Sequence, residues 1–566
     1  MNQTNAKTQD LTPVTSTDTF RVGGINVKIH LISENWHRTN VMWLKGVPFL
    51  QKDPMKVEKL SIIFSNIDDP IKVFKEVKGF FSIIFKRKDV LFAAVDRIRS
   101  IPLFYTWNGK ELVLSDNAQW LEDYIGKSTD PVSASEFLLA GYVTGPYTLN
   151  PNIRQLQAGE AIILKNKELR LERYYHFIPK SDFPSSETLL LRELDNANLT
   201  CIERLITFAN GRPIAIPLSG GMDSRLIAIS LRQLGYKDVL AFSYGRKKNK
   251  ESEISKLIAE QLSIPWYFVE YKEELWRYWY NSLECKRYIC FAENLVSVAH
   301  IQDWPAVMEL KKRKILSPET VIVPGHSGDF VAGSHIPKNL LREKFLDLGK
   351  VVKSIWEHHY VLTTIGFVSK FLSVDTDFPG ESAHERIQEN IRVREIYSPD
   401  DAVGLYYLWD WQERQAKFIV NSVRVYDFFG YDWWIPQWDL EFIDFWAKVP
   451  LSYRLNRCLY RRYLEEIQNR YKITTPYYIA NAEKTTINSM IRELLTKIGL
   501  LSLARLIVRP FVKGCLYPVR RDKLYTTHPL AWYGIVDFSE YKTLLKEGGN
   551  INTILAVKHL KMRMAN

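Results

Sequence analysis

The chain has few cysteines, and their spacing supports no disulfide framework. Five cysteines occur among 566 residues, and none of them belongs to a CxxC pair. In a chain of this size, so few thiols argue against the class of disulfide-stabilised secreted domains. The cysteine content therefore favours a reducing compartment.

Long apolar runs are missing as well. No stretch approaches the roughly 18 apolar residues that a membrane-spanning helix needs. The first twenty residues, MNQTNAKTQDLTPVTSTDTF, contain no apolar core of the signal-peptide type. We therefore expect residues 1–19 to be a disordered leader and the protein to be cytoplasmic.

The sequence has no arginine-rich tail, and its basic residues are spread along the chain, although the formal net charge is +12. A diffuse excess predicts at most a weak attraction to polyanions or an anionic membrane surface, and no nucleic-acid partner. Residues 486–512 predict a basic amphipathic helix, which either touches a membrane surface or a partner or packs against the core. Its basic residues are Arg492, Lys497, Arg505 and Arg509.

Two patterns of secondary structure divide the chain. Residues 20–180 read mostly as strands and predict a first domain, and the polar Pro/Ser stretch at 178–187 predicts a linker. Residues 188–566 predict a second domain, in which strands alternate with helices of about a dozen residues. The strands expected there are 213–218, 239–244, 266–271 and 321–324, and the helices 188–209, 222–234 and 250–262. This alternation predicts a doubly wound parallel sheet.

The two common phosphate-binding fingerprints, GxxxxGK[ST] and GxGxxG, are absent, but AIPLSGGMDSRLIAIS at 215–230 is present. It reads as a buried strand, a turn of small residues and a helix. Glycines permit close backbone approach, and the free N–H groups of a helix N-terminus favour an anion. Asp223 would repel a polyphosphate unless a metal such as Mg²⁺ lay between them. The alternative is an ordinary glycine-rich turn with an aspartate helix cap.

The SGGMDS motif resembles the SGGxDS pyrophosphate loop of the ATP-pyrophosphatase enzymes, which cleave ATP between its α and β phosphates. Three further stretches resemble the asparagine synthetase branch of that superfamily, which is similar to β-lactam synthetases and lasso-peptide cyclases. They are FSYGRKKNKESEISKLIAEQL at 242–262, PGHSGDFVAGSH at 324–335 and PYYIANAEK at 476–484. The second aligns with that family's GEGxDExxGGY through Gly325, Asp329 and Gly333.

The resemblance implies roles for particular residues and two ligands, ATP and Mg²⁺. Asp223 and Asp329 are the implied metal ligands. The implied phosphate contacts are Ser219, Gly220, Gly221, Asp223 and Ser224, and the implied adenosine contacts are Leu218, Tyr244 and Gly325. Glu251 falls where the family often carries an acidic residue. Lys484 takes the place of a catalytic lysine that stabilises the acyl-adenylate transition state, although an exposed loop lysine is the simpler interpretation.

The sequence departs from the family pattern beside the second metal ligand. His326 stands where the family has Glu, or Tyr in its β-lactam-forming relatives, and Phe330 replaces the Glu after Asp329. His326 is a candidate base for an amine nucleophile, because the pKa of an unperturbed histidine suits that task at neutral pH. A hydrogen-bonded structural histidine is the alternative. We expect Phe330 to be a packing residue.

The N-terminal half resembles the glutamine amidotransferase domain of the same family. The similarity lies in GFFSIIFKRKDVLFAAVDRIRSIPLFY at 79–105, which includes Asp96 and Pro102, and in 142–164. The family's nucleophilic cysteine becomes residue 1 after processing, whereas Asn2 stands here and the first cysteine is Cys201. The glutamine-binding NGE stretch is also missing. The domain is therefore expected to lack glutaminase activity.

Together these features imply two domains of mixed α/β and α+β class. The first is an Ntn-hydrolase-like, β-rich sandwich, and the second an adenine nucleotide α-hydrolase-type sheet with helical additions. The implied activity is an AMP-forming amide ligase acting on a small-molecule, sugar or peptide carboxylate. Its nitrogen donor is ammonia, an amine or a partner glutaminase. The alternatives are an intramolecular cyclase, an enzyme that amidates polysaccharide uronic acids, and a non-catalytic scaffold.

Overall fold

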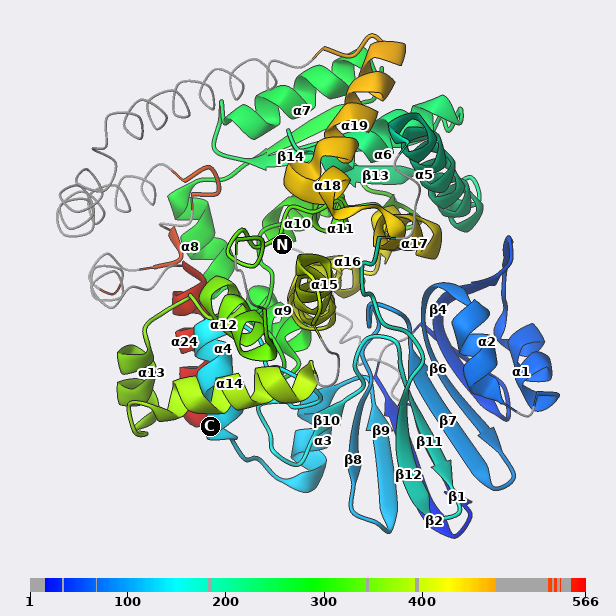
Figure 1. The fold of residues 1–566 in the computed structure, drawn as a ribbon, viewed down its shortest axis with the longest axis vertical. Coiled ribbons are helices and arrows are strands. Elements are labelled where there is room, and N and C mark those ends of the chain that lie inside the picture. Colours follow the sequence, from blue (N-terminus) through cyan, green and yellow to red (C-terminus); the bar gives the residue numbers. More distant parts are fainter. Residues whose placement is uncertain are drawn as a thin grey trace, which may run out of the picture. The chain divides into compact units, whose positions relative to one another are not determined.

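The computed structural model describes residues 16–32, 35–67, 69–181, 186–342, 346–391, 396–474, 528–531, 534–536, 540 and 551–565. Two compact units make up the chain (Figure 1). Unit 1 comprises Met1–Asp130 and Gly145–His176, and unit 2 comprises Pro131–Thr144 and Phe177–Asn566. Lys484 and the amphipathic segment 486–512 lie outside the described residues.

Unit 1 contains two β-sheets. One has the strand order β1-β2-β9-β8-β10, and the other β12-β11-β7-β6-β4-β3 with β5 paired to β4. Neighbouring strands are antiparallel except β2 and β9, which are parallel. The strands are β1 Ser16–Val22, β2 Ile25–Leu31, β3 Trp36–Arg38, β4 Met42–Leu50, β5 Asp53–Pro54, β6 Lys78–Arg87, β7 Val90–Val95, β8 Phe104–Trp107, β9 Glu111–Ser115, β10 Arg154–Gln155, β11 Glu160–Lys165 and β12 Glu168–Arg173.

Alternating side chains give unit 1 two hydrophobic cores, because successive strand residues point to opposite faces. Ile83 of β6 packs with Phe64 and Phe74 from helices α1 (Val57–Ser65) and α2 (Pro70–Glu76). Its neighbour Ile84 packs between the sheets. Helix α3 (Ala118–Ile125) covers β8 and β9. These layers confirm the expected β-rich sandwich.

The first strand begins earlier than the sequence indicated. The expected disordered leader reached residue 19, but β1 begins at Ser16, which pairs with Leu31 of β2. The polar residues STDT read as a leader because their short side chains give no apolar alternation. In the structure, the backbone ladder with β2 orders them instead.

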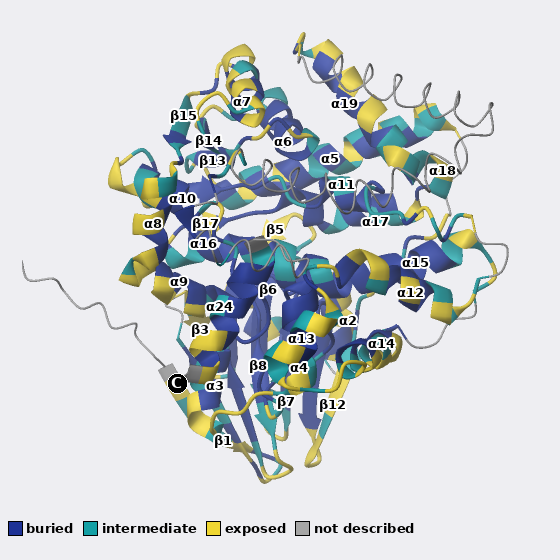
Figure 2. Cartoon of the chain, turned by 90° about the vertical axis from the view of Figure 1, so that its left-hand side faces the viewer, coloured by how far each residue is buried: buried dark blue, intermediate teal, exposed yellow. Residues whose placement is uncertain are grey.

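Unit 2 is built around a parallel sheet of five strands, which confirms the expected architecture. Its order is β15-β14-β13-β16-β17, with all neighbours parallel. The strands are β13 Ile214–Pro217, β14 Val239–Gly245, β15 Trp266–Glu270, β16 Val321–Ile322 and β17 Asp432–Trp433. Figure 2 shows β13 and α6 mainly in the buried colour, whereas α7 presents exposed residues.

Helices surround this sheet and extend unit 2. They are α4 Pro131–Ala140, α5 Glu187–Ala209, α6 Met222–Gln233, α7 Lys250–Gln261, α8 Glu273–Asn281, α9 Leu283–Glu293, α10 Trp304–Lys312, α11 Gly328–Val331, α12 Leu348–His359, α13 Ile365–Leu372, α14 Phe378–Asn390, α15 Pro399–Asp410, α16 Arg424–Phe428, α17 Leu440–Lys448, α18 Leu451–Arg454, α19 Cys458–Arg470 and α24 Ile551–Ala565. A π-helix, Trp411–Ile419, continues α15. Within the described ranges, no helix is both long and apolar enough to cross a membrane.

The segment 131–144 belongs to unit 2 although unit 1 precedes and follows it in the chain. A buried carboxylate anchors it: Glu136 accepts hydrogen bonds from Arg386 of α14 at 2.9 Å and from the backbone N–H of Thr144 at 3.1 Å. The sequence does not predict that this segment belongs to unit 2, because the short helix α4 mixes Ser and Glu with apolar residues and shows no helical apolar stripe.

Candidate active site

Two loops of unit 2 meet where the strand order reverses. β14 and β15 extend the sheet on one side of β13, whereas β16 and β17 extend it on the other. β13 and β16 run parallel, so their carboxyl ends share one edge. Residues 218–221 follow β13, and residues 323–327 follow β16. In open α/β sheets, ligands bind at such a reversal.

Side-chain hydrogen bonds shape the loop after β13. The Ser219 N–H donates to Ser224 Oγ at 3.1 Å, and the Gly221 N–H donates to Ser219 Oγ at 3.0 Å. The Gly220 N–H donates to Glu251 Oε2 at 2.7 Å, so the acidic residue of α7 supports the loop backbone. Helix α6 then begins without a side-chain cap. This uncapped N-terminus presents N–H groups and the positive end of the helix dipole to an anion.

Asp223 and Asp329 lie side by side although 106 residues separate them. The Asp329 N–H donates to Asp223 Oδ2 at 3.1 Å, and the Tyr460 hydroxyl donates to Asp223 Oδ1 at 2.9 Å. Burial, and then the nearby charge of Asp329, raises the pKa of Asp223 to about 7. The guanidinium of Arg457 lies 4.0 Å from Asp329 Oδ2. The two carboxylates therefore concentrate negative charge at the sheet edge.

Glycines permit this close approach between the two loops. A Cβ on Gly325 would lie 2.4 Å from the backbone nitrogen of Ser224, and one on Gly328 would lie 2.9 Å from Asp223 Oδ1. Real Cβ atoms do not come that close to backbone atoms, so Gly325 holds its position by having no side chain. Gly325 thus brings the second loop against the first.

The pair of carboxylates fits a magnesium ion that shares its ligands with a phosphate group. Mg²⁺ prefers oxygen ligands and is usually bound through one or two carboxylates together with substrate phosphates and water. Asp223 and Asp329 supply such oxygens beside the anion-binding end of α6. No cluster of three or more His, Cys, Asp or Glu suited to a metal occurs in the part of the chain that the structure describes.

The expected adenosine contacts are largely engaged within the fold. Leu218 is buried, and its carbonyl accepts from the Ser243 hydroxyl at 2.8 Å. The Tyr244 hydroxyl donates to Asp303, and its ring stacks on Tyr271 with centroids 5.1 Å apart. An adenine base placed beside Tyr244 would therefore contact the aromatic ring, because the hydroxyl is already hydrogen-bonded to Asp303.

His326 is half-buried and lacks the features of an activated base. Burial lowers the pKa of His326 to about 4. Its ring nitrogens lie 3.3 and 3.4 Å from the Ser422 hydroxyl, and no carboxylate in the described ranges forms an ion pair with it. A neutral imidazole with so low a pKa is a weak proton acceptor.

A second histidine, His335, anchors the segment that follows Asp329. Its Nδ1 lies 2.6 Å from the buried Asp410 carboxylate, and its Nε2 lies 3.4 Å from Arg414. Burial alone would raise the pKa of Asp410, yet its histidine neighbours hold that pKa well below the usual range. His335 therefore ties the loop to the end of α15. The family resemblance does not predict a role for this histidine, although it is the last residue of the stretch at 324–335.

In unit 1, the residues of the amidotransferase-like stretch stabilise the fold. Asp96 is fully buried and accepts the N–H groups of Phe81 and Ser100 at 3.0 and 3.2 Å. Arg97 donates to the Lys75 carbonyl at 2.6 Å. Burial raises the pKa of Asp96, and these hydrogen bonds oppose that effect.

The structure brings together most of the sequence-predicted site residues. Those around the reversal point are Ser219, Gly220, Gly221, Asp223, Ser224, Gly325 and Asp329. Lys484 lies outside the described residues, so its role stays a prediction. Sequence reasoning missed Tyr460 and Arg457, which reach the aspartates from α19 and its N-cap. No short-range signal marks them, because the Tyr460–Asp223 contact spans 237 residues.

Comparison with known proteins matches segments in both halves of the chain to protein families. Residues 69–175 match a glutamine amidotransferase domain, and residues 207–516 match asparagine synthase. A Methanocaldococcus jannaschii protein, provisionally named as glutamine-hydrolysing asparagine synthetase 2, is 24% identical over 280 residues. That match covers 46% of this chain and 50% of the relative, so the chain spans about half the length of the curated relative it matches.

Solved structures give weaker similarities. Glutamine phosphoribosylpyrophosphate amidotransferase from B. subtilis, complexed with ADP and GMP, matches at 12% identity with a TM-score of 0.19, over 41% of this chain and 71% of its own. A structure titled as the allosteric regulatory enzyme of purine biosynthesis matches at 12% identity with a TM-score of 0.18, over 41% and 61%. Scores this low say nothing about function. The asparagine synthase match spans more than half of the sequence and includes both aspartate loops, so the chain belongs to the asparagine synthase family.

Proposed function

We propose that the chain is an ATP-dependent amide ligase that releases AMP and pyrophosphate. The observation that carries the proposal is the contact between Asp223 and Asp329 at the reversal point of the parallel sheet. Two adjacent carboxylates beside an uncapped helix N-terminus suit a metal-bound polyphosphate better than any neutral ligand. The family membership supports the same chemistry.

In this proposal, the loop at 219–224 holds the phosphates that leave as pyrophosphate. A bound Mg²⁺ would supply charge neutralisation of the phosphate oxygens, held by Asp223 and Asp329. The substrate carboxylate attacks the α-phosphate, and ammonia or an amine then displaces AMP to form the amide. Lys484 is the candidate for stabilising the developing charge. The weak basicity of His326 favours an amine that reaches the site already deprotonated.

The test is magnesium-dependent ATP binding, measured by calorimetry with a non-hydrolysable ATP analogue. Asp223→Asn and Asp329→Asn should each weaken binding more than tenfold, because a lost ligand leaves phosphate charge uncompensated. Asp377→Asn is the matched control, since Asp377 is exposed and its side chain makes no cap hydrogen bond on α14. Turnover with an acid should yield AMP and pyrophosphate. Release of ADP and phosphate, or binding indifferent to both aspartates, would reject the proposal.

A further inference from the structure

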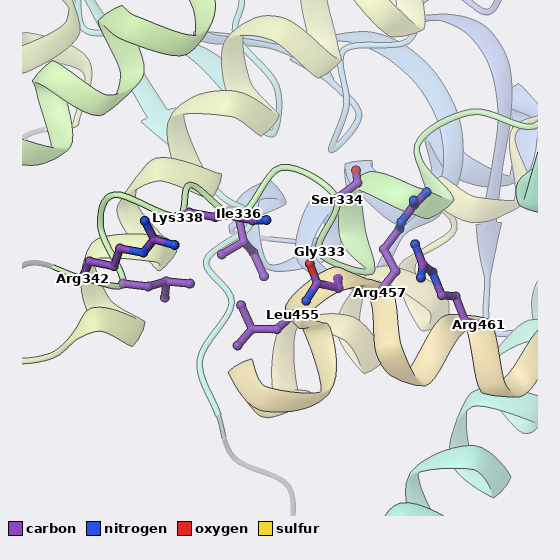
Figure 3. Close-up of a pocket in the computed structure, with 10 residues that line it drawn as sticks. Gly333, Ser334, Ile336, Lys338, Arg342, Leu455, Arg457 and Arg461 are labelled. Carbon is purple, nitrogen blue, oxygen red and sulfur yellow. The ribbon is translucent and has the colours of Figure 1, made fainter. Parts of the chain in front are cut away.

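A cavity of about 480 Å³ adjoins the aspartate pair and is rich in positive charge. Four of its ten lining residues are basic, and none is acidic. The four are Lys338, Arg342, Arg457 and Arg461 (Figure 3). A hollow lined by one sign of charge concentrates ions of the opposite sign, so the cavity attracts an anion.

The basic residues form two pairs on opposite sides of the cavity. Figure 3 shows Arg457 and Arg461 on the side of α19, and Lys338 and Arg342 across from them, with Ile336 and Leu455 between. Arg457 also lies 4.0 Å from Asp329, so its side of the cavity adjoins the proposed ATP site. The Lys338–Arg342 pair, which we call the distal pair, is on the other side.

Among the residues that the structure describes, no carboxylate neutralises the charges of the distal pair. Lys338, Arg342 and Arg461 are exposed, and within the described residues none of them has a carboxylate partner at salt-bridge distance. Folding alone therefore gives no reason for these three cations to gather. Arginine presents its N–H donors as a planar fork that matches the oxygens of phosphate, whereas lysine adds a point charge.

The backbone beside Arg457 reinforces the attraction for anions. Asn456 and Arg457 both adopt left-handed conformations, with φ of 54° and 59°. This turn starts α19 at the cavity wall, and no side chain caps that helix. The N-terminus of α19, a helix of 13 residues, thus adds its partial positive charge to that of the arginines.

We propose that this cavity binds the acid substrate and that the substrate carries a second anionic group, a phosphate, against Lys338 and Arg342. The inference rests on the proposed function, because it places the reacting carboxylate on the Arg457 side, next to Asp329. The apolar Ile336 and Leu455 then contact the carbon skeleton between the two anionic ends. The substrate class is a phosphorylated carboxylic acid, in contrast to a sugar or peptide acid without a phosphate group.

The experiment compares matched pairs of acids in calorimetric titrations without ATP. The probes are 3-phosphoglycerate with glycerate, and glucuronic acid 1-phosphate with glucuronic acid. At least one phosphorylated acid should bind ten times more tightly than its unphosphorylated partner. In Lys338→Gln/Arg342→Gln, that preference should fall below twofold. Lys256→Gln, which removes an exposed lysine from α7, is the control and should keep it.

Two further titrations of the double variant, one with magnesium and the ATP analogue and one with pyrophosphate, separate the possible failures. Magnesium-dependent ATP binding should be unchanged in the double variant, since the distal pair does not line the loop at 219–224. If the double variant keeps the phosphate preference, or loses only pyrophosphate binding, the cavity is not a site for a phosphorylated acid. If the wild-type protein prefers the phosphorylated acids but does not bind ATP, the proposed function fails while the anion site stands.

Discussion

At the scale of single residues, the site depends on hydrogen bonds that orient Asp223. The Tyr460 hydroxyl and the Asp329 N–H each donate to one of its carboxylate oxygens. The Gln437 amide donates to the Asp223 carbonyl at 3.2 Å and lies 3.3 Å from the Tyr460 hydroxyl. Asp223 is therefore fixed from several directions, and a ligand in a fixed orientation binds a metal without paying a large ordering entropy.

Tyr460→Phe should raise the magnesium concentration needed for half-maximal ATP binding about tenfold. The substitution removes a 2.9 Å hydrogen bond to a carboxylate, and such bonds contribute about 1.5–3 kcal/mol. Tyr463→Phe is a matched control on the same helix, because its hydroxyl donates at 2.9 Å to Asp195, away from the aspartate pair. Magnesium titrations at fixed nucleotide concentration measure the difference. Equal effects of the two variants would mean that Tyr460 acts only through the stability of α19.

At the scale of elements, the π-helix after α15 carries a buried ion pair. Lys417 Nζ lies 2.5 Å from Glu413 Oε2, and both side chains are completely buried. Lys417 also donates to the Val143 carbonyl at 3.0 Å. Gln415 of the same segment accepts from the Ser327 hydroxyl at 2.8 Å, which links the π-helix to the loop before Asp329. This π-helix spans nine residues, and π-helical turns inserted in α-helices are frequently found at functional sites.

Lys417→Met should lower the free energy of unfolding by about 3–5 kcal/mol, because it leaves Glu413 buried without its cation. Lys353→Met is the control: Lys353 forms an exposed pair with Glu357 at 3.9 Å on α12, and exposed pairs contribute at most about 1 kcal/mol. Urea denaturation of both variants tests the contrast. A double variant, Glu413→Leu/Lys417→Met, should recover part of the loss. Similar small losses for both single variants would contradict a structural role for the buried pair.

The sequence predicts the elements of unit 2 more closely than it predicts the site. Helices expected at 188–209, 222–234 and 250–262 occur at Glu187–Ala209, Met222–Gln233 and Lys250–Gln261. Apolar periodicity and turn residues are local signals, so they locate such elements well. No local signal in the sequence predicts the roles of Tyr460 and Arg457 or the two-residue strand β17. They act through contacts between distant segments, which depend on how the helices pack.

At the scale of the whole molecule, unit 2 contains histidines whose burial makes its stability sensitive to acid. Burial lowers the pKa of His559 to about 4. Within the described residues, neither ring nitrogen of His559 has a hydrogen-bond partner, and Nδ1 lies 3.7 Å from Glu293. His359 is also buried, and burial lowers its pKa to about 3. Protonation of either ring thus favours the unfolded chain, whose histidines have a pKa of about 6.5.

The melting temperature should therefore fall as the pH falls from 6.5 towards 4. The unfolded state binds more protons than the folded state in this range, so stability rises with pH. Above pH 6.5 the histidines are neutral in both states, and their contribution is fully present. His559→Gln should reduce the slope by about one proton, since glutamine does not titrate. Thermal melts at half-unit pH steps measure the slope of melting temperature against pH. An unchanged slope in this variant would show that other groups cause the acid sensitivity.

Part of unit 1 matches a glutamine amidotransferase domain, but we expect this unit to be unable to cleave glutamine. The first cysteine of the sequence is Cys201, which lies in unit 2 and is buried. Burial raises the pKa of the Cys201 thiol well above its usual range, so it is a poor nucleophile. Asp96 and Arg97 are engaged in the hydrogen bonds that hold unit 1 together. We therefore expect unit 1 to act as a structural framework.

Glutamine should therefore not serve as the nitrogen donor of the purified chain. Amide cleavage by this class needs a thiolate and a nearby base, so we expect no release of glutamate from glutamine, with or without Mg-ATP. Asn2→Cys should not restore it, because the glutamine-binding NGE stretch is also missing. Ammonium or an amine should support product formation once the acid is supplied. The deciding measurement uses amide-¹⁵N glutamine against ¹⁵N ammonium: label from glutamine in the product amide, without a partner glutaminase, would show that unit 1 is active.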